Sequence, residues 1–297
     1  MYVEPHVRHP PLCRHIRIPP QYLLDSYMPR YLMLTRKQLK DKIAKAEKLL
    51  HNCRLCPHNC AVDRYQSRAN SCITGINGSG SIFFASCNMR CVFCQNHEIS
   101  HIRDAGEMLT AEEVGEWMVK LQDMGQCINF VTPEHVVPIV VKALTKARGL
   151  GLKIPIVYNT SSFDSMESLK LMDGLVDIYL ADFKLWLPDS AKRLLESERY
   201  PGAFTGDGLA KQGVLIRHRI MPNRLDESRQ ILKYIANEVD KDSYVNIMSQ
   251  YFPSGHEVAF DMKNRHVTDE EIEDIMTAAR RLGLWRFNRA EEYSGYA

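Results

Sequence analysis

Three closely spaced cysteines, Cys87, Cys91 and Cys94, are the residues of this sequence with the clearest capacity for chemistry. They form a C-x3-C-x2-C run, Cys-Asn-Met-Arg-Cys-Val-Phe-Cys. Cysteine thiolates hold iron–sulfur clusters, and three of them on one short loop can bind three irons of a 4Fe–4S cluster. The fourth iron then keeps an open position for a substrate or cofactor, whereas a cluster fully ligated by cysteine mainly transfers electrons. The spacing therefore favours an enzyme over an electron carrier.

A zinc ion is the alternative occupant of these thiols. Zinc prefers four ligands in a closed tetrahedron, and His97 or His101 could supply the fourth ligand. Phe93, directly before the last cysteine, could lie flat against the planar ring of a bound molecule. The aromatic-rich run at 81–85 follows a glycine-containing turn and predicts a strand. The cysteine loop would then leave the C-terminal end of that strand.

A second group of cysteines precedes this loop, and its members are Cys53, Cys56, Cys60 and Cys72. In a long chain without a secretory signal, closely spaced cysteines favour metal ligation over disulfides. Four thiolates can close a zinc tetrahedron or hold a second, fully ligated cluster. We favour a structural metal that pins the N-terminal region to the rest of the protein. An auxiliary electron-relay cluster is the rival interpretation.

The composition of the 297 residues is that of an ordinary globular protein, 45% hydrophobic and 25% charged, with a formal net charge of +2. So small a net charge gives no strong attraction to nucleic acid or to a membrane surface. No apolar stretch approaches the length of a membrane span, and the N-terminus lacks the apolar segment of a secretory signal. We therefore expect a cytoplasmic protein with neither a membrane nor a nucleic acid as partner.

From residue 81 onward, apolar runs alternate with helical patterns, which predicts parallel strands joined by helices. The predicted strands are 81–85, 127–131, 154–158, 177–182, 214–220 and 244–248. The predicted helices are 111–124, 136–149, 165–172, 190–196, 226–238 and 269–282, with capping boxes at Thr110 and Thr268. Six strand–helix units are too few for a closed eight-stranded barrel and suit a partial one. The predicted fold is α/β, a partial (β/α)6 TIM-like barrel with an N-terminal cysteine-containing extension.

Three segments are expected along the chain. Residues 1–34 are proline-rich and predict an extended arm. Residues 35–76 contain a helix capped by Thr35 and then the second cysteine group, and we expect them to form a metal-binding segment. Residues 77–297 are expected to form the core domain, in which the loop at 197–213 is long enough to cover a site.

The cysteine run and several later motifs resemble the radical S-adenosylmethionine (radical SAM) enzymes, in particular the uncharacterised branch related to pyruvate formate-lyase activating enzymes. The resemblance covers roughly residues 50 to 285, and the matching stretches are 78–96, 128–133, 157–161, 176–184, 215–218 and 245–251. It implies the (β/α)6 architecture, a 4Fe–4S cluster on the three-cysteine loop and S-adenosylmethionine as the molecule that chelates the open iron. One electron would then split its S–C5′ bond into methionine and a 5′-deoxyadenosyl radical, which removes a hydrogen atom from the substrate.

The same resemblance implies cofactor contacts at the ends of the second and third strands. Thr132, Pro133 and Glu134 stand in the place of the family's Gly-Gly-Glu motif, which presents backbone carbonyls to the methionyl amine. Pro133 departs from glycine but keeps its carbonyl. On the residues alone, an ordinary helix start explains this motif equally well. Asn159 and the following Thr160-Ser161 could bind ribose hydroxyls, or could form a polar turn that caps the next helix.

Charged residues interrupt the fourth and fifth strands, which are otherwise apolar. Asp182 and Lys184 alternate with a phenylalanine, so both point the same way if the strand continues. Such a buried pair must meet a ligand or form an internal salt bridge. Arg217 could bind the carboxylate of the cofactor in a bidentate fork. His218 could face the substrate cavity or lie hydrogen-bonded in the core.

The expected function is that of a radical SAM oxidoreductase of unknown substrate that takes its electron from a reductant such as flavodoxin or ferredoxin. One alternative is a glycyl-radical activating enzyme, which removes hydrogen from a glycine of a partner protein. The other is a non-enzymatic metal scaffold or electron carrier that uses both cysteine groups. The sequence names no substrate, because substrate contacts in such barrels come from variable loops.

Overall fold

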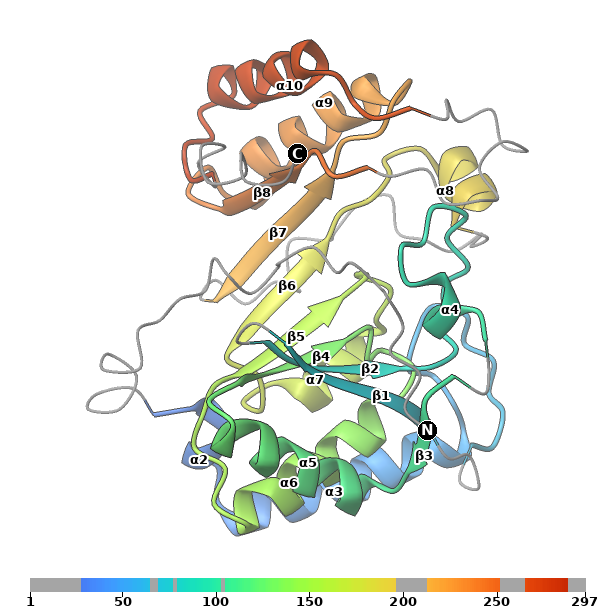
Figure 1. The fold of residues 1–297 in the computed structure, drawn as a ribbon, viewed down its shortest axis with the longest axis vertical. Coiled ribbons are helices and arrows are strands. Elements are labelled where there is room, and N and C mark those ends of the chain that lie inside the picture. Colours follow the sequence, from blue (N-terminus) through green and yellow to red (C-terminus); the bar gives the residue numbers. More distant parts are fainter. Residues whose placement is uncertain are drawn as a thin grey trace.

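The computed structural model describes residues 28–64, 69–76, 79–102, 105–195, 213–251 and 265–287. Most of the expected N-terminal arm (1–34) and of the expected loop at 197–213 lies outside these residues. Within them the chain forms one eight-stranded sheet with helices packed against it (Figure 1). No helix in these ranges is long and apolar enough to cross a membrane.

The strands of the sheet lie in the order β3-β1-β2-β4-β5-β6-β7-β8. They are β1 (Ala69–Ile76), β2 (Ser79–Phe84), β3 (Glu107–Leu109), β4 (Cys127–Val131), β5 (Ile156–Thr160), β6 (Ile178–Asp182), β7 (Val214–Arg219) and β8 (Tyr244–Met248). Strands β2 and β4 to β8 are parallel, which confirms the six predicted strands. Strands β1 and β3 add an antiparallel edge beside β2. The sequence does not predict this edge, because β1 contains glycine, alanine and short polar residues that are weak strand formers.

The helices alternate with the parallel strands as predicted. They are α2 (Arg30–Met33), α3 (Arg36–His51), α4 (His97–Ser100), α5 (Ala111–Asp123), α6 (Val137–Gly149), α7 (Met166–Met172), α8 (Pro188–Leu194), α9 (Leu225–Tyr234), the π-helical turn η1 (Ile235–Val239) and α10 (Asp269–Arg281). Thr35, Thr110 and Thr268 begin α3, α5 and α10 in capping boxes, where each hydroxyl accepts from the backbone N–H three residues on. The α/β class is confirmed, and the alternation is compatible with a partial barrel.

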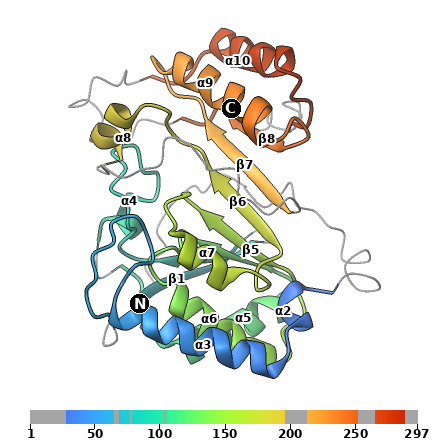
Figure 2. The ribbon, with the colours of Figure 1, turned by 180° about the vertical axis from the view of Figure 1, so that it is seen from behind.

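The hydrophobic core lies between the sheet and its helices. Helices α3, α5 and α6 lie at one end of the sheet, and α9 and α10 lie at the other (Figures 1 and 2). Phe84 and Phe130 of the sheet are completely or almost completely buried in one cluster with Met118 of α5. Ile216 of β7 is buried in a second cluster with Ile231 of α9. Both sheet ends therefore bury one apolar face against helices.

The other face of the sheet is polar although it is buried. Side chains alternate along a strand, and register partners on neighbouring strands share a face. The buried polar residues on this face are Ser81, Asn129, Asn159, Asp182, Arg217 and Asn246. A parallel sheet covered on both faces normally carries apolar side chains on both. The polar row therefore marks the face on which a site is to be sought.

The described end of the N-terminal arm is helical rather than extended. Tyr31 of α2 is completely buried, and its hydroxyl donates to the carbonyl oxygen of Ile154 at 3.1 Å. The backbone N–H of Arg30 donates to Asp177 Oδ1 at 2.8 Å. These last residues of the expected arm form a helix that lies on the body of the protein, because a buried aromatic ring and a carboxylate at the helix start hold α2 there.

The segment 35–76 is joined to the rest of the chain through both the core and the sheet. Leu39 and Leu49 of α3 are buried in the same cluster as Phe130. Strand β1 pairs along its length with β2, on the other side of the expected boundary at residue 76. Helix α3 therefore shares a hydrophobic core with the residues beyond position 76, and strand β1 shares a sheet with them.

Candidate active site

Four residues that closely follow parallel strands take left-handed backbone conformations, although none is glycine. Ser86, Thr132, Ser162 and Asn223 have φ angles of 62°, 49°, 62° and 63°. They follow β2, β4, β5 and β7. Such conformations cost about 1–3 kcal/mol each, persist only where the surrounding structure holds them, and cluster at ligand sites. The C-terminal edge of the parallel strands is therefore the place at which we build the site.

The loop 87–94 carries the three cysteines and leaves the C-terminal end of β2, as the sequence predicts. Hydrogen bonds hold it on two sides. The backbone N–H of Cys87 donates to Ser100 O at 3.0 Å, and that of Val92 donates to Leu194 O at 3.0 Å. Helices α4 and α8 thus fix the path of the loop.

The thiols of this loop lie close enough for their charges to act on one another. Burial raises the pKa of Cys87 well above its usual value and raises the pKa of Cys91 to about 12, and the charge of Cys94 adds to both shifts. Lys184 and Arg219 act on the pKa of Cys91 in the opposite direction. Cations beside thiols favour the thiolate, and they would offset the negative charge of a thiolate-ligated cluster.

Within the described ranges, no three cysteine, histidine, aspartate or glutamate side chains converge as ligands of a single metal ion. A 4Fe–4S cluster makes a different demand, because each thiolate binds its own iron and the sulfurs stand farther apart than around one ion. The three thiols of the loop 87–94, with cations beside them, fit that demand in number, type and charge.

Three other candidates near the cysteines have partners of their own. Phe93 is 4% exposed and lies in the apolar cluster beneath the loop, so little of its ring is free to face a bound molecule. His97 and His101, the candidate zinc ligands, stack on each other with their ring centroids 4.2 Å apart. Ser100 Oγ lies 2.8 Å from His101 Nδ1 and 3.1 Å from Cys94 Sγ.

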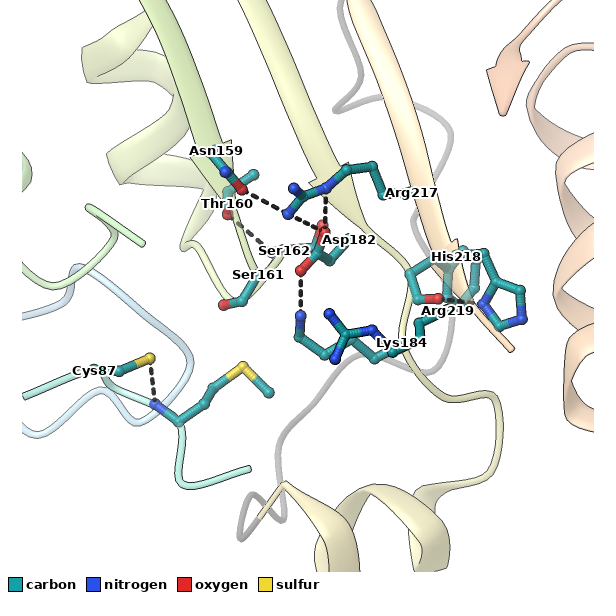
Figure 3. A network of polar contacts seen from close by, with 12 residues as sticks. Cys87, Asn159, Thr160, Ser161, Ser162, Asp182, Lys184, Arg217, His218 and Arg219 are labelled. Atoms are coloured by element: carbon teal, nitrogen blue, oxygen red, sulfur yellow. Dashed lines mark hydrogen bonds and ion pairs between the residues drawn. The ribbon is translucent and has the colours of Figure 1, made fainter. Parts of the chain in front are cut away.

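Arg217 joins three strands at the centre of the polar face (Figure 3). Its Nε donates to Asp182 Oδ1 at 2.6 Å, and its Nη2 donates to Asn159 Oδ1 at 2.6 Å. Lys184 Nζ donates to the other oxygen of the same carboxylate, Asp182 Oδ2. Burial alone would raise the pKa of Asp182, but Arg217 and Lys184 together hold it below its usual value. The network thus brings two cationic side chains to one buried carboxylate.

Arg219 belongs to the same site, although the sequence analysis does not single it out. Its Nη2 donates to Gln95 Oε1 at 3.2 Å, and Gln95 Nε2 donates to Gln250 O at 3.0 Å. Because Gln95 follows Cys94 directly, this chain of bonds ties the cysteine loop to the ends of β7 and β8. The signal that could have found it is the strand period of two, since Arg217 and Arg219 share a face.

Glu134 is completely buried just before α6 and is bonded through one oxygen. Its Oε1 accepts from Ser161 N at 2.5 Å, Ser161 Oγ at 2.7 Å and Thr160 Oγ1 at 2.8 Å. Its Oε2 has no hydrogen-bond partner among the described residues. Burial raises the pKa of Glu134. A buried carboxylate oxygen without a donor costs about 1–3 kcal/mol, so a donor on a ligand would relieve that cost.

The two residues before Glu134 form the turn that places it. Thr132 has the left-handed φ of 49°, and its backbone N–H donates to Asn159 O at 2.8 Å. Pro133 O accepts from Val136 N at 2.9 Å. Glycine takes the left-handed region most readily. The chain therefore keeps, with threonine, the backbone conformation expected of a glycine at this position.

His218 lies on the opposite face of β7 from Arg217. It is 1% exposed, and its Nδ1 lies 2.7 Å from Phe183 O. Its Nε2 lies 2.8 Å from Ser228 Oγ on α9. Successive side chains on a strand point to opposite faces, so His218 belongs to the sheet–helix interface. The sequence allows His218 either to face the substrate cavity or to lie hydrogen-bonded in the core, and in the structure it lies in the core.

Three members of the second cysteine group lie together on the loop after α3. The loop is closed by hydrogen bonds from Cys53 N to Val62 O at 3.0 Å and from Ala61 N to Cys53 O at 2.9 Å. Arg64 Nη2 lies 3.6 Å from Cys60 Sγ. Although partial burial opposes it, that guanidinium helps hold the pKa of Cys60 below its usual value.

The second group lies beside the first. His58 Nε2 lies 2.8 Å from Asn88 O, and Asn88 directly follows Cys87. The side chain of Asn88 also bonds the thiol of Cys56. Cys72 lies on β1 opposite Phe83 of β2, and its side chain is outside the described part of the chain.

No family model matches the chain. The chain is similar to a protein of Methanocaldococcus jannaschii that is described as an uncharacterised protein. The two are 29% identical over 267 residues, which are 82% of this chain and 78% of the relative. The likeness thus extends over most of both proteins.

Proposed function

We propose that this chain is a radical SAM enzyme, with a 4Fe–4S cluster on Cys87, Cys91 and Cys94 and S-adenosylmethionine as its second cofactor. The two cofactors together supply a 5′-deoxyadenosyl radical that abstracts hydrogen from the substrate. The observation that carries the proposal is the three-thiol loop at the C-terminal end of β2, with Lys184 and Arg219 beside it. Cationic side chains suit both an anionic cluster and the carboxylate of S-adenosylmethionine.

The Asp182 network is proposed to bind the carboxylate of S-adenosylmethionine. Arg217 and Lys184 both donate to Asp182 in this network, and cationic side chains of this kind suit the carboxylate of a ligand. Asn159 accepts from Arg217 and thereby orients the guanidinium. A guanidinium held in this way loses little conformational entropy when it binds a ligand carboxylate.

Glu134 is proposed to accept a hydrogen bond from the methionyl amine. Its Oε2 is a buried acceptor with no partner among the described residues. Thr132 keeps the left-handed turn that brings Glu134 to this position. The backbone N–H and the hydroxyl of Ser161 both donate to Glu134. The ribose contact expected after the third strand is therefore proposed for Asn159, or for a hydroxyl group that gives up its present hydrogen bond when the cofactor binds.

Burial of these polar groups has a second consequence. Asp182, Arg217 and Glu134 are all less than a tenth exposed. A site that excludes water strengthens each charge interaction and protects a reactive radical from side reactions. The substrate remains unnamed, and a glycine of a partner protein is one candidate for it.

We also propose that Cys53, Cys56, Cys60 and Cys72 hold a structural metal, whose binding would draw together the three described thiols, which do not converge on one point in this structure. The support is the contact of this loop with Asn88, next to Cys87. A metal here would hold the cysteine loop in place from the N-terminal side. We further propose a cytoplasmic protein that takes electrons from a carrier such as flavodoxin or ferredoxin.

The direct test is product analysis. Protein reconstituted anaerobically with iron and sulfide, then reduced in the presence of S-adenosylmethionine, is expected to release 5′-deoxyadenosine and methionine. Cys91→Ala should abolish both products, while Cys127→Ala, which removes a thiol at the far end of β4, should release them as the wild type does. Cleavage that persists in the Cys91 variant would show that the three-cysteine assignment is wrong, and an inert wild type with a full cluster would favour an electron carrier.

A further inference from the structure

The hydroxyl of Thr160 lies between two carboxyl groups. Thr160 Oγ1 is 2.8 Å from Glu134 Oε1 and 2.5 Å from Asp164 Oδ2. It also accepts from the backbone N–H of Ser162 at 2.8 Å. A threonine hydroxyl has one hydrogen and can donate to only one acceptor. One of the two carboxyl contacts therefore needs a proton supplied by the carboxyl group.

The remaining contacts locate that proton. Glu134 Oε1 already accepts from the N–H and the hydroxyl of Ser161, so it has no room for a proton of its own. Asp164 Oδ1 accepts from Tyr158 Oη at 2.6 Å, which leaves Asp164 Oδ2 to act as a donor. With the proton on Asp164 Oδ2, the chain runs from Asp164 through Thr160 to Glu134, and every member has a partner.

The surroundings of Asp164 favour its neutral form. The ionisable groups that act on it are Glu134 before α6, Tyr158 on β5 and Tyr179 on β6. Burial raises the pKa of Asp164 to about 8, and the charge of Glu134 adds to the shift. Burial likewise raises the pKa of both tyrosines, so they are neutral over the same range of pH.

We infer that Asp164 is a positioning residue that holds a proton and, through Thr160, keeps Glu134 Oε1 fully bonded so that Oε2 faces an N–H donor of the bound ligand. The inference rests on the proposed function for the identity of that ligand. It adds a residue that touches neither the cluster loop nor the ligand. When Asp164 ionises, two carboxylates compete for the one hydrogen of Thr160, so Glu134 keeps this orienting donor for only part of the time.

An asparagine at position 164 tests this role because it copies the protonated acid. Its amide can donate to Thr160 and its carbonyl can accept from Tyr158. We expect the affinity of the reconstituted wild type for S-adenosylmethionine to fall roughly tenfold as the pH rises from about 7 to about 9, the effect of losing one hydrogen bond to a charged group. Asp164→Asn should bind as tightly as the wild type at the lower pH and keep that affinity at the higher one.

Thr160 supplies the matched controls. Thr160→Ser keeps the hydroxyl and should bind like the wild type, whereas Thr160→Val keeps the shape and should bind roughly tenfold more weakly at both pH values. An Asp164→Asn variant with the pH dependence of the wild type, or one that loses affinity at the lower pH, would overturn the inference.

A second readout needs no cofactor. The pKa of Asp164 in the folded protein is about 8, above its ordinary value of 3.8. Its stabilising contribution is therefore fully present below the ordinary pKa and is lost as the pH rises through about 8. The unfolding temperature of the wild type should therefore fall as the pH rises through about 8, and that of Asp164→Asn should not show this fall. If the wild type binds no S-adenosylmethionine, the proposed function fails, yet this profile still decides whether Asp164 holds the proton. Identical profiles for both proteins would overturn the inference.

Discussion

Asp182 and Arg217 are register partners on β6 and β7, and the guanidinium of Arg217 donates to the Asp182 carboxylate from Nε at 2.6 Å. Both residues are less than a tenth exposed. Removing Arg217 leaves the Asp182 carboxylate with Lys184 as its remaining cation in the network. We predict that Arg217→Met lowers the free energy of unfolding by about 3 kcal/mol, the lower end of the cost of breaking a buried pair, measured by urea denaturation.

A double variant separates the loss of the pair from the loss of packing. Arg217→Met combined with Asp182→Leu should recover part of the stability, because no charge is then left unpaired on the two strands. Lys184 would still need an acceptor, so full recovery is not expected. A single variant within about 1 kcal/mol of the wild type, a cost typical of exposed pairs, would contradict the buried network.

Thr132 offers a test of the strained turn before Glu134. Thr132→Gly should relieve about 1–2 kcal/mol of left-handed strain and lose roughly 0.5–1 kcal/mol through the greater freedom of the unfolded glycine. The net change in unfolding free energy is expected to lie between about zero and a gain of 1.5 kcal/mol. Thr132→Ala keeps the Cβ atom and should show no such gain. If glycine destabilised the protein more than alanine does, strain at Thr132 would not be the correct explanation.

His218 provides a pH-dependent test away from the proposed cofactor site. Burial lowers the pKa of His218 to about 4, below its ordinary value of 6.5. The stability that this neutral ring contributes is present above the ordinary pKa and is lost as the pH falls through about 4. His218→Gln should flatten that acid limb in thermal unfolding and should leave the affinity for S-adenosylmethionine unchanged. If His218→Gln greatly lowered the affinity for S-adenosylmethionine and left the stability unchanged, His218 would have to be assigned to the cofactor site.

The second cysteine group is tested by metal analysis. In a Cys53→Ala/Cys56→Ala double variant prepared anaerobically, we expect bound zinc to be lost and the iron and sulfide of the first cluster to remain. Four thiolates bind zinc as a closed site, which explains why removing two ligands should release it. Loss of iron and sulfide in place of zinc would mean that the group holds an auxiliary cluster. A Cys127→Ala variant should keep the wild-type metal content.

The six parallel strands are predictable because each is a short apolar run that alternates with a helical pattern, which is a local signal. The loop 87–94 and the alternation of Asp182 with Lys184 are equally local. Strand β1 has no such local signal, because many of its residues are small or polar. Its position depends on pairing with β2. Helix α2 depends on the contact of Arg30 with Asp177, which is far away in the sequence. The spacing of apolar residues therefore does not predict it.

The site residues divide in the same way. Glu134 follows a predicted strand and Arg217 interrupts one, so the sequence marks both positions. Asp164 is not marked in this way, because its role depends on the approach of Thr160 and Glu134 from two different segments. For His218 the sequence allows two positions, and only the pleat of β7 decides that it faces α9. The structure is therefore needed to assign a role to a residue when that role depends on the face of the sheet from which its side chain projects.

Electron paramagnetic resonance of the reduced, reconstituted protein tests the central proposal most directly. An iron that lacks a protein ligand should respond when a chelating molecule binds to it. We predict a reduced-cluster signal that changes on addition of S-adenosylmethionine and that is absent from Cys91→Ala. A signal of full intensity that is identical with and without S-adenosylmethionine would contradict the account.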